Sequence, residues 1–198
     1  MKILLIGASG TLGAGVHAAL RARGHDVLTV GRSGGDLRYD VTEPAQVTEL
    51  YDRAGRVEAV AVAAGYVPYK LLTEMTPDDF LVGFRGKVLS QIELVRQGLS
   101  CIADRGSFTL ISGVPAREPI PSGTAASMAN GAVEAFVRAA AIEIAPRRIN
   151  VVSPTIFTES LADYGPYFPG MPPVDLADVA MAYVRSIEGA QTGQVYAL

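Results

Sequence analysis

The chain of 198 residues has no tryptophan, one cysteine and two histidines. A single thiol, Cys101, cannot form an internal disulfide. With only His17 and His25 as further soft ligands, the sequence offers no obvious metal site, and we expect none. Charge of one sign is also not in excess, since the formal net charge is −3. We therefore expect neither a nucleic acid nor an anionic membrane as a partner.

Long apolar runs are missing as well, and a membrane-spanning helix needs about 20 apolar residues. Met1 and Lys2 are followed only by the short run Ile3–Ile6 before a glycine, which is too short for the apolar core of a secretory signal. Hydrophobic residues nevertheless make up 49% of the chain, which excludes a disordered protein. We expect a soluble, cytoplasmic protein with a single domain over residues 1–198 and a short substrate-side segment at about 155–175.

Short apolar runs alternate with amphipathic patterns of helical period along the whole chain. The predicted strands are Lys2–Ile6, Asp26–Val30, Glu58–Ala63, Ser107–Ser112, Arg148–Val152 and Gln194–Ala197. The predicted helices are Thr11–Arg23, one marked by the cap Thr42 and by Pro44, Pro77–Ser100 and Thr124–Ala145. Such alternation is typical of the α/β class with a doubly wound, mostly parallel sheet of the Rossmann type and three layers.

The connection from the second strand to a further short strand, Asp36–Tyr39, is unusual. Only Gly31–Gly35 separate the two strands, whereas a parallel crossover normally needs a dozen residues or more. Five extended residues span roughly 16 Å, which is enough to return along a short strand without a helix. A hairpin is the alternative, because Gly34–Gly35 also suits a tight turn. We favour the parallel strand that lacks its helix.

A glycine-rich segment, Gly7-Ala8-Ser9-Gly10-Thr11-Leu12-Gly13, joins the first strand to the first helix. In this pattern Gly7 allows a tight turn, Gly10 allows the backbone to approach a pyrophosphate, and Gly13 allows the helix to pack closely on the strand. The free N–H groups at the helix start favour phosphate binding. The segment therefore predicts a dinucleotide site with Ser9, Thr11 and Leu12 among its contacts.

The tip of the second strand, Val30-Gly31-Arg32-Ser33, indicates which dinucleotide binds. An acidic residue at this place binds the ribose 2′-hydroxyl of NAD, whereas an arginine accommodates the 2′-phosphate of NADP. The tip carries no acidic residue, so Arg32 and Ser33 favour NADP(H). A solvated surface arginine is the alternative interpretation of Arg32.

Together these residues resemble the short-chain dehydrogenase/reductase family, and the resemblance covers nearly the whole chain. It implies further cofactor contacts from Asp40-Val41 near the adenine, from Ala63-Ala64-Gly65 below the cofactor, and from Pro154, Thr155 and Thr158 near the nicotinamide. It also implies NADPH as cofactor, a small-molecule substrate, and a homodimer or homotetramer formed through the two long helices.

The same resemblance implies a catalytic Asn, Ser, Tyr and Lys, the last two in a Tyr-x-x-x-Lys motif on the helix after the fifth strand. Here Thr124 and Met128 stand at the Tyr and Lys positions, and Gly83 stands at the Asn position. Ser112 retains the serine only approximately. Methionine carries no charge and a threonine hydroxyl is far less acidic than a phenol, so we identify a short, atypical member whose usual proton relay is lost.

Other groups are candidates for the missing proton donor. We name Ser112, Thr124, Lys87 and Tyr66 as candidate catalytic residues, although Lys87 also fits a solvated charge on a helix. Two functions remain open. One is an atypical NADP(H)-dependent oxidoreductase that acts on a small carbonyl or activated alkene. The other is a catalytically silent NADP(H)-binding protein that regulates a partner.

Overall fold

The computed structural model covers residues 1–198 and contains one seven-stranded sheet. The strands are β1 (Lys2–Ile6), β2 (Asp26–Gly31), β3 (Leu37–Arg38), β4 (Val57–Val62), β5 (Ile102–Ile111), β6 (Arg148–Ser153) and β7 (Val195–Ala197). They lie in the order β3-β2-β1-β4-β5-β6-β7, and all neighbours are parallel. The winding direction reverses between β1 and β4, so the predicted doubly wound sheet is confirmed.

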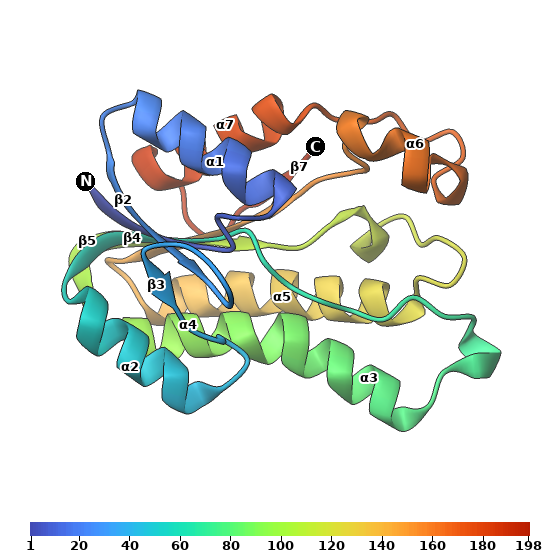
Figure 1. Ribbon diagram of the computed structural model, residues 1–198, viewed down its shortest axis with the longest axis horizontal. Helices are drawn as coiled ribbons and strands as arrows, with labels where there is room; N and C mark the ends of the chain where they lie inside the picture. Colours follow the sequence, from blue (N-terminus) through green and yellow to red (C-terminus); the bar gives the residue numbers. More distant parts are fainter.

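Helices cover both faces of this sheet (Figure 1). They are α1 (Thr11–Ala22), α2 (Pro44–Ala54), α3 (Pro77–Gly83), α4 (Ser90–Gly98), α5 (Thr124–Glu143), α6 (Leu161–Tyr164) and α7 (Leu176–Glu188). Single-turn elements are η1 (Leu72–Glu74), the π-helical turn η2 (Phe84–Leu89), η3 (Val114–Ala116), η4 (Thr158–Ser160) and η5 (Gly165–Tyr167). The helices α1 and α7 pack together on one face, and α2, α4 and α5 lie on the other. The three predicted layers are therefore present.

The short strand β3 is parallel to β2, so the interpretation without a helix is confirmed and the hairpin is wrong. The turn is held by the Asp36 carboxylate, which accepts hydrogen bonds from Thr29 N and Thr29 Oγ1 at 2.9 and 2.7 Å. Gly35 has a φ of +102°, and a Cβ there would lie 2.9 Å from Thr29 O. Only glycine fits this return path, because both the conformation and the contact exclude a side chain.

Two helical predictions need correction, and one helix was missed. The expected helix Pro77–Ser100 is interrupted by η2, and Leu81 on its supposed apolar stripe is exposed. The helix α2 has Glu43 as its N-cap residue, whereas the hydroxyl of Thr42 donates to Asp40 instead. The helix α7 was not predicted at all.

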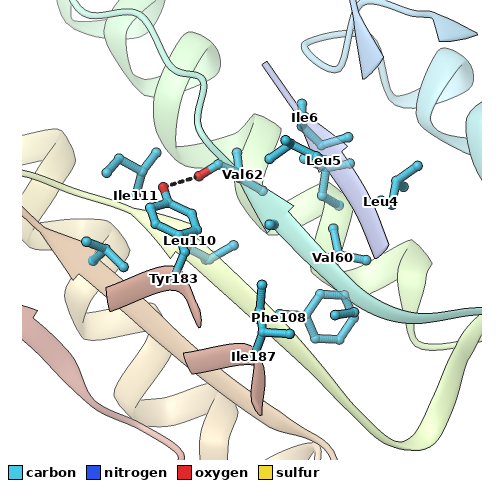
Figure 2. Close-up of a cluster of buried hydrophobic side chains, with 14 of the residues drawn as sticks. Leu4, Leu5, Ile6, Val60, Val62, Phe108, Leu110, Ile111, Tyr183 and Ile187 are labelled. Atoms are coloured by element: carbon cyan, nitrogen blue, oxygen red, sulfur yellow. Dashed lines mark hydrogen bonds between the residues drawn. The ribbon is translucent and has the colours of Figure 1, made fainter. Parts of the chain in front are cut away.

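The buried core includes Ile6, Val62 and Ile111, the last residues of β1, β4 and β5, so it holds the strand ends from which the loops start (Figure 2). Tyr183 on α7 is completely buried beside Ile111 and Leu110, and its hydroxyl donates to Val62 O at 2.6 Å. Val62 is the last residue of β4, so this bond ties α7 to the point where the Ala63–Gly65 loop begins.

None of the helices combines the length and the apolar composition that crossing a membrane requires.

Candidate functional site

A cavity of about 760 Å³ lies along the C-terminal ends of β1, β2 and β4. Its lining residues are Ile6, Gly7, Ser9, Gly10, Gly31, Arg32, Ser33, Tyr39, Asp40, Val41, Thr42, Val62, Ala63, Ala64, Gly65, Tyr66, Val82, Arg85, Gly86 and Ser90. The cavity therefore sits where the winding of the sheet reverses, which is where open α/β sheets bind ligands. Most residues of the predicted cofactor site meet in it.

The glycine-rich loop forms one end of the cavity. Gly7 has a φ of +84°, and a Cβ on Gly13 would lie only 2.0 Å from Gly7 O, so neither position tolerates a side chain. The helix α1 begins at the N-cap residue Gly10 without any side-chain cap. Its first N–H groups are therefore left for an anion. Thr11 is exposed at this helix start, and Leu12 belongs to the core instead.

Arg32 and Asp40 lie together at the β2 side of the cavity, and Arg32 is exposed there beside Ser33. Both the backbone N–H and the hydroxyl of Thr42 donate to Asp40 Oδ1, at 2.9 and 2.7 Å. Partial burial raises the pKa of Asp40, but the bonds from Thr42 and the charge of Arg32 outweigh it, and the net shift is downward. Asp40 is thus an ionised carboxylate within the field of an arginine that forms no ion pair.

The loop after β4 packs directly on the glycine-rich loop. A Cβ on Gly7 would lie 2.8 Å from both Ala63 O and the Ala64 side chain. Gly65 lies against Lys87, since its Cβ would come within 3.1 Å of Lys87 Cγ. This part of the cavity is therefore made of small residues, and the Lys87 stem packs against one of them, Gly65.

The opposite wall contains residues that sequence reasoning missed: Val82, Arg85, Gly86 and Ser90. They come from α3, η2 and the start of α4. Tyr66 N donates to Gly86 O at 3.1 Å, and a Cβ on Gly86 would lie 2.8 Å from Tyr66 O. This close approach accompanies the π-helical turn.

Lys87 extends from η2 to the end of β5, where its Nζ donates to Ser112 O at 3.3 Å. The side chain is half-buried, and burial lowers the pKa of Lys87 to about 8. Lys87 is therefore not the solvated charge of the alternative interpretation. Gly83, which we placed at the family's Asn position, packs on Val67 and Pro68 instead. The helix position that reaches the ends of β4 and β5 is Lys87.

The Ser112 hydroxyl is hydrogen-bonded inside the protein and does not line the cavity. It donates to Glu134 Oε1 at 2.9 Å, and the Ser153 hydroxyl donates to the same oxygen at 2.8 Å. Ser112 and Glu134 are only 4% and 5% exposed. The predicted contact of this hydroxyl with a substrate does not fit its placement, because the hydroxyl already donates its hydrogen bond to a buried carboxylate. The carbonyl group of Ser112, by contrast, accepts the hydrogen bond from Lys87.

Thr124 and Met128 are both exposed on α5. Residues of an α-helix are spaced by about 100°, so Met128 points to nearly the opposite side from Asn130. Asn130 is buried, and its Nδ2 lies 3.4 Å from where Gly113 would carry a Cβ. The α5 positions that face the end of β5 are therefore Asn130 and Ala126, one turn earlier. Our placement of the lost Tyr and Lys at Thr124 and Met128 is off by two residues, and the facing positions also lack that pair.

The three residues after β6 that we expect to contact the cofactor, Pro154, Thr155 and Thr158, differ in their hydrogen bonding. Pro154 is buried and its carbonyl accepts from Val114 N, whereas Thr155 Oγ1 is buried without any hydrogen-bond partner. The Thr158 hydroxyl donates to Asp175, the N-cap residue of α7.

Of the candidate proton donors, only Tyr66 lines the cavity itself. No group of three or more His, Cys, Asp and Glu residues is arranged to hold a metal ion.

Comparison with known proteins agrees with this geometry. The family model described as enoyl-(acyl carrier protein) reductase matches residues 12–196. The chain belongs to the short-chain dehydrogenase/reductase family.

Individual relatives are similar over most or all of the chain. The crystal structure of the protein lin1944 from Listeria innocua is 44% identical, with a TM-score of 0.98 over 100% of this chain and 99% of that one. A small-chain dehydrogenase in complex with NADPH is 23% identical, with a TM-score of 0.89 over 100% of this chain and 96% of that one; at this identity it shows the fold alone. The versicolorin reductase stcU of Emericella nidulans is 28% identical over 75% of this chain, and the match spans 65% of that reductase's length.

Proposed function

We propose that the protein is an atypical NADP(H)-dependent oxidoreductase that reduces a small carbonyl or activated alkene, with Lys87 as its proton donor. The observation that carries this proposal is the half-buried Lys87, whose stem packs on Gly65 of the cavity lining and whose ammonium donates to Ser112 O at the end of β5. Activity and substrate class are proposed for this chain from its site. The family match to enoyl reductases and the similarity to a versicolorin reductase support redox chemistry.

The residues present fit NADPH along the whole cavity. The uncapped start of α1 suits the pyrophosphate, and the guanidinium of Arg32 with Ser33 suits the 2′-phosphate. Asp40 and Val41 flank the space for the adenine. After β6, outside the lining of this cavity, the buried Thr155 hydroxyl has no partner and would be available to the carboxamide.

NADPH, when bound, supplies a hydride; the protein has to orient the reactants and provide a proton. Lys87 meets the second need, because an ammonium whose pKa is about 8 is protonated at neutral pH and yields its proton more readily than an exposed lysine does. The carbonyl of Ser112 holds Nζ in place, and the missing side chain of Gly65 leaves room for the lysine stem. The segment 155–175 would close the substrate side.

A catalytically silent NADP(H)-binding protein is the second candidate. The observation in its favour is that Ala126 and Asn130 occupy the α5 positions facing the end of β5, and neither is a phenol or a cation. The homodimer or homotetramer predicted from the resemblance stays a prediction under either function.

Two measurements separate the candidates. Calorimetry should show NADPH binding more tightly than NADH, and Arg32→Ala should remove this preference while Arg38→Ala, on β3 outside the cavity, should keep it. A panel of carbonyls and enoyl thioesters should then give NADPH oxidation that Lys87→Met abolishes. Tight NADPH binding without turnover on any compound would support the silent protein instead. A chain that binds neither dinucleotide would overturn both.

A further inference from the structure

Buried polar atoms without a hydrogen-bond partner are concentrated at one place in this molecule. Four such side-chain atoms exist, in Ser127, Asn130, Arg147 and Thr155. Ser127 and Asn130 lie one turn apart on α5, and Thr155 follows the end of β6. Asn130, whose Nδ2 lies 3.4 Å from where Gly113 would carry a Cβ, and Thr155 therefore both lie near the C-terminal edge of the sheet. Unsatisfied buried groups are rare in proteins, and each requires a reason.

Asn130 is the most demanding of these groups, because it is only 3% exposed and its Oδ1 has no partner. Its Nδ2 approaches Gly113, the residue after Ser112. Ser112 O in turn accepts the hydrogen bond from Lys87. Asn130 and Lys87 thus approach the same two-residue segment, one from α5 and the other from η2.

A second buried asparagine shows what a structural role looks like in this chain. Asn150 on β6 is fully buried, and its Nδ2 donates to Ser186 Oγ at 3.2 Å and to Gln191 O at 3.0 Å. Its Oδ1 accepts from Gln194 N at 3.0 Å. Both the donor and the acceptor group of that amide form hydrogen bonds, and two of these bonds join β6 to the segment before β7. The Asn130 oxygen joins nothing, so stability of the fold does not explain it.

We propose that Asn130 is a ligand-binding residue at the reaction end of the site, and that its amide oxygen accepts a hydrogen bond from a hydroxyl or amide N–H of the bound ligand. This inference rests on the proposed function. Such a donor exists in the nicotinamide half of the cofactor and in a hydroxylated substrate. Because a ligand supplies the missing partner, Asn130 should reduce the stability of the free protein and improve the stability of the complex.

The test compares Asn130→Leu with the matched control Asn150→Leu. Leucine has a similar volume and no polar atom. Replacing an unsatisfied amide should raise the melting temperature of the free protein by about 2–4 °C, whereas replacing the satisfied amide of Asn150 should lower it. Calorimetry then measures the binding of NADPH and of adenosine 2′,5′-bisphosphate, the fragment that lacks the nicotinamide half.

In Asn130→Leu, affinity for NADPH about tenfold weaker with unchanged affinity for the fragment supports the proposal and assigns the donor to the cofactor. Unchanged affinity for both with lost turnover also supports it and assigns the donor to the substrate. A melting temperature that falls as in Asn150→Leu, or unchanged binding and turnover, would overturn it. If the wild-type chain binds no NADP(H), the proposed function fails, and this result is separate from the effect of Asn130→Leu on stability.

Discussion

Replacing Lys87 by methionine should make the free protein more stable while abolishing its activity. Burial lowers the pKa of Lys87 from its ordinary value of 10.5 to about 8. A difference of this size corresponds to about 3 kcal/mol at ~1.4 kcal/mol for each pKa unit, which is an upper limit for a half-buried group. This is the free energy that the fold loses by holding the charged form out of water. Methionine has a similar length and loses nothing in this way.

The direction of the pH dependence follows from the pKa in each state. Below pH 8 the folded and unfolded forms both carry the proton, so the destabilising effect of the buried charge is fully present. Between about 8 and 10.5 the unfolded form binds more protons, so the stability of the wild-type protein rises with pH in that window. The advantage of Lys87→Met should therefore be about 1–3 kcal/mol at neutral pH and disappear toward the upper end of the window.

Urea unfolding of both proteins at neutral and alkaline pH measures this difference. Lys70→Met is the control, because Lys70 is exposed and paired with Asp79 at 2.7 Å, and its loss should give no gain at either pH. A Lys87→Met protein that is less stable at neutral pH, or whose advantage does not change with pH, would refute the interpretation of Lys87 as a desolvated cation. A variant that keeps wild-type turnover would refute its role as proton donor.

Further predictions concern both ends of the cavity. Turnover should decline as the pH rises through about 8, where Lys87 loses its proton, and a profile flat across that range would contradict the assignment. Arg32→Ala should weaken NADPH binding about tenfold or more and leave NADH binding unchanged in calorimetry. Ser112→Ala should lower the free energy of unfolding by about 1–3 kcal/mol, because Glu134 loses a donor, yet keep turnover; an inactive but folded variant would return Ser112 to the mechanism. Gly13→Ala should abolish NADPH binding, since its Cβ would lie 2.0 Å from Gly7 O; unchanged affinity would contradict this.

The fold was predictable from the sequence because each local pattern agreed with the global arrangement. Buried strands alternated with helices, and the glycine-rich loop marked the first turn. The helix α7 could have been found, since Val179, Tyr183 and Ile187 follow helical spacing and are all buried. The π-helical turn could not have been found in this way. It coincides with a contact between Gly86 and Tyr66, and these residues are too far apart in the sequence for a local pattern to indicate the contact.

The cofactor half of the site followed from contiguous motifs, but the reaction end did not. Its residues come from elements far apart in the sequence, and the length of the loop between β5 and α5 leaves the register of α5 undetermined in the sequence. The amphipathic pattern held a clue, because Asn130 is a polar residue among the buried positions Ala126, Ala129 and Val133. Lys87 was found as a candidate, although only its contact with Ser112 separates it from an ordinary surface lysine.

A crystal structure of the protein with bound NADPH tests the central claim most directly. The dinucleotide should extend from Arg32 to Thr155 across the switch between β1 and β4, with Lys87 Nζ within about 4 Å of the oxygen-binding space beside the reactive nicotinamide carbon. A nicotinamide ring placed away from Lys87, or a cavity that stays empty at saturating NADPH, would contradict the account.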